Sequence, residues 1–216
     1  MDIKINKLYE MFLHAQDVGF EYGVTFSLRS SPKLKEFMGD LDPELPLDWS
    51  GKSFYGLPEL RERIILTQDY NTSVDNVLVT AGTNEAIFLV LTQTISPGDE
   101  VVIDQPSWPQ VYELCTAYGA KVTVVKRRED LGWGLDIDEL EEAVTPKTRL
   151  IFVNSPNNPT GAVFTDQEMN RICEIARKND SYLLSDEVYR NLEWNGKISP
   201  AAVNFYEKAI STSSVS

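Results

Sequence analysis

The sequence has few of the residues on which metal sites and histidine-based catalysis depend. Its 216 residues include two cysteines and one histidine, and a structural zinc site takes four such ligands. We therefore expect no metal site. A catalytic dyad would have to use His14, but this residue lies in an amphipathic stretch and is expected on the face of a helix. Cys115 and Cys173 lie in helix-like segments, where buried free thiols are expected rather than a disulfide.

Long apolar runs and an excess of positive charge are also missing. The sequence has no run of about 18 apolar residues, so we expect no membrane span. The N-terminal stretch MDIKINKLYEMFLHAQD has no long apolar core and carries acids, unlike a secretory signal. We therefore expect a cytoplasmic protein. The formal net charge is −13, which argues against binding to nucleic acid or to anionic membranes.

What is present falls into two regions. Residues 1–50 hold one expected helix, near 5–18, and then a stretch with prolines and mixed charges that is typical of an arm or loop. From Gly56 the pattern becomes regular. Helices are expected at 57–70, 83–95, 106–119, 135–145 and 165–180, and strands at 77–80, 100–104, 120–126, 148–154, 181–186 and 207–214. Apolar strands that alternate with helices predict an α/β fold, a three-layer sandwich around a mostly parallel sheet.

Ligands of such sheets bind beyond the carboxyl ends of the strands, so the residues there are candidates for a site. After 77–80 comes AGTNEA, in which Gly82 permits a tight turn. Thr83 and Asn84 then begin a helix, whose N-terminus favours a phosphate group. After 100–104, Trp108 could stack on a flat ligand. Both stretches have a plainer explanation: a capped turn, and a tryptophan that packs its helix onto the sheet.

The next two strand ends carry more specific runs. SPNNPTG follows 148–154, and Asn158 before a rigid proline turn is a well-placed donor, although a purely structural turn remains open. Asp186 ends the strand 181–186 and needs a partner, because a buried unpaired carboxylate is costly. A protonated ring nitrogen would be such a partner, and Tyr189 could reach the same pocket. A helix N-cap is the alternative for Asp186. Together the four strand ends describe a pocket for a flat, phosphorylated, nitrogen-containing ring, such as pyridoxal 5'-phosphate.

Three of these runs carry a resemblance to a known family. GTNEA, SPNNPTG and SDEVY, in this order, resemble the class I/II aminotransferases of fold type I, over about residues 55–216. The resemblance implies that 51–216 is an incomplete pyridoxal-phosphate-binding large domain, and that the C-terminal small domain is absent. It makes 1–50 the N-terminal arm and part of the small domain. It also implies a homodimer that acts on amino acids and 2-oxo acids.

The resemblance also assigns roles to the candidate residues. Asp186 would keep the pyridine nitrogen protonated, because a nearby carboxylate favours the cation. Asp186 and Tyr189 would therefore be the catalytic residues of this chain. The implied cofactor-binding residues are Gly82, Thr83, Asn84 and Ser214 for the phosphate, Trp108 for the ring face, Asn158 and Tyr189 for the phenolic oxygen, Asp186 for the ring nitrogen, and Ser216 beside the lysine position.

The end of the sequence bears on the same motif. Ser214, Val215 and Ser216 match the start of the family's Ser-x-Ser-Lys, so the Schiff-base lysine is expected immediately after Ser216. Either the chain is a true truncation, or the next residue is a lysine already bonded to the cofactor. We favour the second, since a random boundary would rarely fall at this position.

Other features depart from the family. Tyr55 directly precedes Gly56, whereas the family's tyrosine lies several residues earlier, so Tyr55 receives no role. The arginine after the lysine motif, the arginine of the small domain and the seventh strand are missing, so this chain alone could not complete a transamination. The alternatives are another reaction on the same cofactor (a C–S or C–C lyase, a decarboxylase or a specialised biosynthetic enzyme) or an inactive fragment. Specificity is not readable, and Leu28, Arg29 and Ser30 are expected in a surface loop.

Overall fold

The computed structural model describes residues 7–19, 21, 33–39, 42, 44, 53–194 and 196–214. The chain divides into two compact units, Ile5–Phe54 and Tyr55–Ser216, the second together with Met1–Lys4. In the smaller unit, helix α1 spans Lys7–Val18 and helix α2 spans Leu34–Phe37, which confirms the helix expected near 5–18. His14 is exposed on α1, as expected. The three residues 28–30, predicted to form a surface loop, lie outside the described residues.

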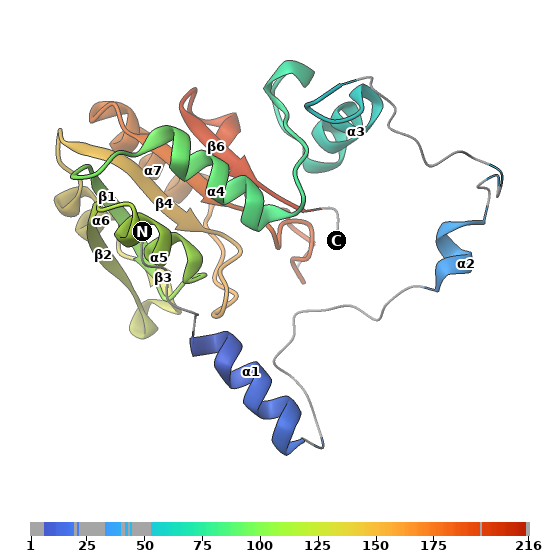
Figure 1. Cartoon of the computed structure of the whole chain (residues 1–216). Helices are drawn as coiled ribbons and strands as arrows, with labels where there is room; N and C mark the ends of the chain where they lie inside the picture. Colours follow the sequence, from blue (N-terminus) through green and yellow to red (C-terminus); the bar gives the residue numbers. More distant parts are fainter. Residues whose placement is uncertain are drawn as a thin grey trace. The chain divides into compact units, whose positions relative to one another are not determined.

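The larger unit is built around one sheet (Figure 1). Its strands follow the order β3-β2-β1-β4-β5-β6 within the described residues. The bounds are Glu100–Gln105 for β1, Lys121–Arg128 for β2, Gly134–Leu135 for β3, Thr148–Asn154 for β4, Tyr182–Asp186 for β5 and Ala209–Thr212 for β6. All neighbouring pairs are parallel except β2 and β3, which are antiparallel. The short strand β3 was not expected from the sequence.

Helices cover both faces of this sheet, which confirms the predicted three-layer α/β sandwich. The bounds are Pro58–Gln68 for α3, Thr83–Thr94 for α4, Gln110–Ala117 for α5, Ile137–Ala143 for α6 and Asp166–Lys178 for α7. Alternate residues of each strand point to opposite faces, and the core divides accordingly. Val101 and Ile103 of β1 pack with α4 and α5, whereas Val102 packs with α6 and α7. Each buried strand therefore serves two separate hydrophobic cores.

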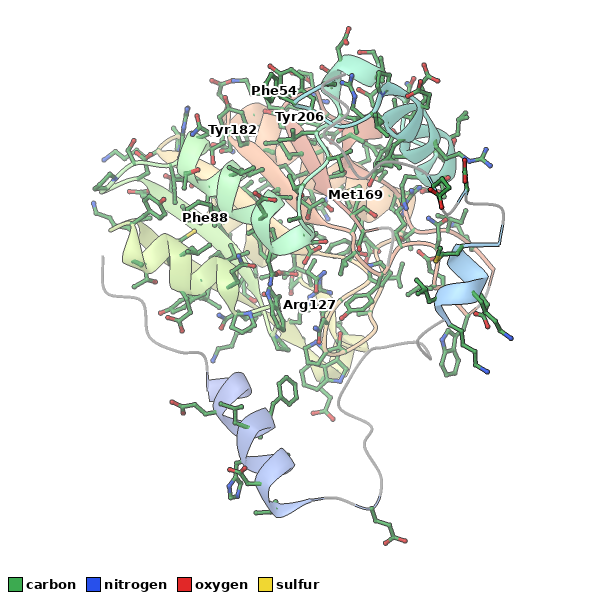
Figure 2. All side chains as sticks on the ribbon, turned by 45° about the vertical axis from the view of Figure 1, so that its right-hand side comes forward. Phe54, Phe88, Arg127, Met169, Tyr182 and Tyr206 are labelled. Atoms are coloured by element: carbon green, nitrogen blue, oxygen red, sulfur yellow. The ribbon has the colours of Figure 1, made fainter. Side chains whose placement is uncertain are left out.

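Local sequence explains where the helices begin. The N-terminus of α7 has a capping box, in which the Thr165 hydroxyl accepts from the Glu168 amide and the Glu168 carboxylate accepts from the Thr165 amide. Helix α5 begins only at Gln110, after the proline-rich turn. Helix α4 is apolar in sequence but only partly buried, since Phe88 is 40% exposed (Figure 2). Met169 of α7 is fully buried. Within the described residues, no helix is both long and apolar enough to cross a membrane.

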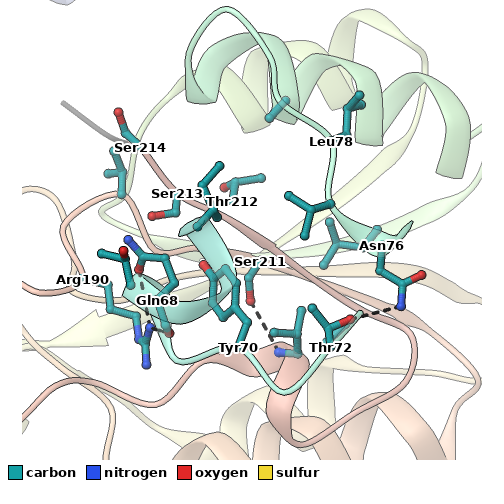
Figure 3. Close-up of a pocket in the computed structure, with 18 of the residues that line it drawn as sticks. Gln68, Tyr70, Thr72, Asn76, Leu78, Arg190, Ser211, Thr212, Ser213 and Ser214 are labelled. Carbon is teal, nitrogen blue, oxygen red and sulfur yellow. Dashed lines mark hydrogen bonds between the residues drawn. The ribbon is translucent and has the colours of Figure 1, made fainter. Parts of the chain in front are cut away.

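The prediction of a strand at 77–80 was wrong. These four residues belong to no sheet, and the Val79 amide donates to the Tyr55 carbonyl at 2.9 Å. A strand requires a neighbour for its ladder of hydrogen bonds. A cavity of about 1120 Å³ lies between Val77–Thr80, α3, α4 and the outer edge of β6 (Figure 3). Leu78 and Ser211 line opposite sides of it, so the segment has no sheet neighbour to pair with.

Candidate functional site

The two most specific runs of the sequence meet at the carboxyl ends of β4 and β5. These strands pair in parallel register, with Asn154 opposite Asp186. The Asn158 side chain lies in the turn after β4, and its amide nitrogen is 3.3 Å from the Tyr189 hydroxyl. Both side chains are half-buried. Two neutral polar groups therefore converge at one point, where they can bind a single oxygen atom of a ligand.

Asp186 is the last residue of β5 and is only 3% exposed. Its Oδ1 accepts hydrogen bonds from the Val188 amide at 3.3 Å and from the Thr212 hydroxyl at 3.4 Å. Within the described residues, both hydrogen bonds reach Oδ1. Oδ2 can therefore accept from a further donor. Burial raises the pKa of Asp186 to about 6, and the two hydrogen bonds only partly oppose this effect. The site therefore holds a carboxylate that a cationic donor would stabilise.

The predicted phosphate residues form a second group. Gly82 has φ 87° and ψ 167° before α4, a conformation that is essentially restricted to glycine. The Thr83 hydroxyl donates to the Ser213 carbonyl at 3.2 Å, which joins the start of α4 to the segment after β6. Asn84 is exposed, and its carbonyl accepts from Gln110 at 2.9 Å. Thus Gly82, Thr83 and Ser213 come together at one helix N-terminus, whereas the Asn84 side chain faces solvent.

Of the remaining predicted residues, the structure describes Trp108 and Ser214 but not Ser216. Trp108 is half-buried in the turn before α5, where α5 is linked to the start of α4 by the Gln110 hydrogen bond. Ser214 is half-buried and lines the cavity beside β6 (Figure 3). Ser216 and the expected lysine position lie outside the described residues. The roles of all these residues therefore stay predictions.

A buried ion pair under the SPNNPTG turn was missed by the sequence analysis. Arg127 of β2 donates to Asp104 of β1 through Nε at 2.9 Å and through Nη2 at 2.6 Å, and both side chains are fully buried. The pair also holds the backbone of Asn154: its carbonyl accepts from Arg127 at 2.8 Å, and its amide donates to Asp104 at 3.3 Å. The available signal was an acid that ends an apolar strand, the same signal that identified Asp186.

Another buried carboxylate, Glu187, directly follows Asp186 and is fully buried. It accepts hydrogen bonds from the Ser211 hydroxyl at 2.6 Å, the Ala202 amide at 2.9 Å and the Tyr70 hydroxyl at 3.3 Å. Burial raises the pKa of Glu187, and the hydrogen bonds from Ser211 and Ala202 together with the nearby Arg190 oppose that rise. Glu187 therefore has partners within the protein and ties β5 to β6 and to the end of α3.

Comparisons with known proteins agree with this geometry. The family model described as aminotransferase class I and II matches residues 52–216. The chain is 38% identical to the aspartate aminotransferase of Sulfolobus acidocaldarius, over 68% of this chain and 38% of that protein. It is 35% identical to the aspartate/prephenate aminotransferase of Thermus thermophilus, over 71% of this chain and 42% of that protein. The chain thus spans about 40% of the length of these relatives.

Solved structures give the same result. A PLP-dependent aminotransferase from Streptococcus suis is 28% identical, with a TM-score of 0.85 over all of this chain and 59% of that one. The aspartate aminotransferase of Thermus thermophilus with maleate is 30% identical, with a TM-score of 0.70 over 74% of this chain and 43% of that one.

Proposed function

The chain belongs to the class I and II aminotransferases, and from this premise we propose that it forms the cofactor-binding part of an enzyme that moves an amino group between an amino acid and a 2-oxo acid. The proposed cofactor is pyridoxal 5'-phosphate. The whole protein would supply the lysine after Ser216. We further propose a cytoplasmic homodimer. The buried free thiols of Cys115 and Cys173 support a reducing compartment.

The observation that carries the proposal is the environment of Asp186. A carboxylate that is 3% exposed, with Oδ2 available, is costly in this position unless a cation or a proton joins it. The pyridine nitrogen of pyridoxal phosphate, once protonated, is a cationic donor of the right kind. Asn158 and Tyr189, 3.3 Å apart, suit its phenolic oxygen. The N-terminus of α4, which begins at Thr83 after Gly82, suits its phosphate through its free backbone amides. The donor set therefore fits the cofactor.

When bound, the cofactor would supply an electron sink for charge that develops at the substrate α-carbon. The residues of this chain would bind and orient it. Asp186 would hold a proton at the ring nitrogen, because the carboxylate favours the charged form. Asn158 and Tyr189 would bind the oxygen next to the reacting carbon. Trp108 would cover one ring face and exclude water from it.

The test is a transamination assay of the full-length protein with pyridoxal phosphate. The amino donors to try first are aspartate and an aromatic amino acid, because the relatives are named for such substrates. With 2-oxoglutarate as acceptor, we expect glutamate to form only when both substrates are present. Product release that does not depend on the 2-oxo acid would instead point to elimination or decarboxylation. Absence of cofactor binding would refute the proposal altogether.

A further inference from the structure

The buried ion pair Asp104–Arg127 and the side chain of Asn154 form one connected group at the carboxyl ends of β1, β2 and β4. At Asn154 the ion pair contacts the backbone, through the amide and the carbonyl. The side chain of Asn154 is fully buried and points the other way, toward the site. We call these three residues the support group.

The side chain of Asn154 contacts both of the residues proposed to hold opposite sides of the ring. Its Nδ2 donates to the Asp186 carbonyl at 2.9 Å. Its Oδ1 accepts from the Asn158 amide at 2.7 Å. One amide group therefore fixes the backbone of both ring-binding residues. A shift of Asn154 would move Asp186 and Asn158 together.

The ion pair is a poor explanation for stability alone. Removing two charges from water costs several kcal/mol, and a well-packed apolar replacement is often neutral or stabilising. Arg127 also makes more contacts than the pair needs: its Nη1 is 3.3 Å from the Trp133 carbonyl, and its guanidinium lies 4.9 Å from the centre of the Phe164 ring. These contacts fix the fork of Arg127 in one orientation, which suits a role in geometry.

We propose that the support group is a positioning device, which holds Asn158 and Asp186 at the spacing that the cofactor ring requires. This inference rests on the proposed function. Asp104, Arg127 and Asn154 are positioning residues. Asn154 contacts the two ring-binding residues, and Asp104 and Arg127 act through Asn154. The inference predicts that loss of the ion pair weakens binding at the ring end of the cofactor and leaves the phosphate end unchanged.

The experiment uses the double variant Asp104→Leu/Arg127→Met, which removes both charges together and leaves neither buried alone. The affinity for pyridoxal phosphate is measured by absorbance titration, and inorganic phosphate is titrated as a competitor. We expect the dissociation constant for pyridoxal phosphate to rise about tenfold, as for a lost supporting contact, while the inhibition constant of phosphate stays within twofold. The absorption band of the bound cofactor should move toward that of the free cofactor.

Two further variants keep the test decisive. Arg128→Met is the matched control, because Arg128 is the next residue of β2 and pairs with Asp130 and Asp136 at the surface. It should leave both constants unchanged. If the double variant does not fold, Arg127→Lys replaces it, since a lysine keeps the charge but cannot hold Asp104 and the Asn154 carbonyl as a fork. We expect a severalfold loss of cofactor affinity in that variant.

The outcomes separate the inference from the proposed function. A folded variant that binds pyridoxal phosphate as tightly as the wild type would overturn the inference alone. An equal loss of affinity for pyridoxal phosphate and for phosphate would also overturn it, because the effect would then not be confined to the ring end. A wild-type protein that does not bind pyridoxal phosphate would overturn the proposed function, and the inference with it.

Discussion

Replacing Asp186 by asparagine should stabilise the protein when no cofactor is present. The wild-type carboxylate is 3% exposed, and its burial raises the pKa of Asp186 from the ordinary 3.8 to about 6. This rise of about 2 in the pKa means that the ionised carboxylate destabilises the folded state by about 3 kcal/mol. Asparagine removes this cost and can still accept from Val188 and Thr212. Its new amide group needs a hydrogen-bond partner, and this requirement reduces the gain in stability by about 1 kcal/mol.

The sign of the pH dependence follows from the raised pKa. Protonated Asp186 stabilises the folded state, and this contribution is complete below pH 3.8 and is lost as the pH rises through about 6. The advantage of Asp186→Asn should therefore be about 2 kcal/mol at pH 7.5 and close to zero at pH 4.5. The assay is urea unfolding of both proteins at the two pH values, without cofactor. Asp75→Asn, at an exposed position, serves as the control and should change the free energy of unfolding by less than about 0.5 kcal/mol.

Two results would refute this reasoning. If Asp186→Asn is no more stable than the wild type at pH 7.5, the carboxylate does not carry the inferred cost. If its advantage is the same at pH 7.5 and pH 4.5, the gain has another origin than the charge. Saturating pyridoxal phosphate should reverse the order of stability, because a ligand stabilises the protein that binds it more tightly.

Three other changes test other parts of the structure. Glu187→Gln should lower the free energy of unfolding by about 1–3 kcal/mol, because the new amide meets hydrogen-bond donors in a buried site; urea unfolding measures this. Gly82→Ala should cost about 1–3 kcal/mol from backbone strain at φ 87°. Apart from its chain neighbours, no described residue has an atom within 4 Å of the added carbon, so a larger loss would contradict this account. Cys115 and Cys173 should react with a thiol reagent only after unfolding, because burial raises the pKa of each thiol to about 12.

Much of the fold was predictable because it depends on local patterns. The apolar runs at 100–104, 148–154 and 181–186 became parallel strands, since a strand buried on both faces must be apolar throughout. The helix expected at 165–180 was also confirmed, and its start is a local feature, the capping box of Thr165 and Glu168. The segment 77–80 has the same local character, but a strand also depends on a neighbour. That information is not contained in the segment itself, and the prediction was wrong for this reason.

The residues proposed to bind the cofactor ring could be predicted from the sequence, whereas the support group could not. Asp186 ends a strand and Asn158 and Tyr189 lie shortly after one, and parallel strands bring their carboxyl ends to one edge. The contacts of Arg127 with Asp104 and Asn154 join residues 23 and 27 positions apart, through one particular side-chain orientation. No local pattern encodes such a contact. Only the unusual acid at the end of an apolar strand indicated that Asp104 needed a partner.

The three buried carboxylates differ in what neutralises them, and this difference points to the cationic ring. Asp104 has Arg127, and Glu187 has three donors from the protein. Asp186 has two neutral donors, both on Oδ1 among the described residues, so of these three carboxylates it is the one left to pair with a cationic ligand. An analogue of pyridoxal phosphate with a ring carbon in place of the nitrogen should therefore bind the wild type at least tenfold more weakly than the cofactor does, a difference of about 1.4 kcal/mol. In Asp186→Asn the two should bind alike, because the charge pair is gone; an undiminished difference would place the ring nitrogen against another residue.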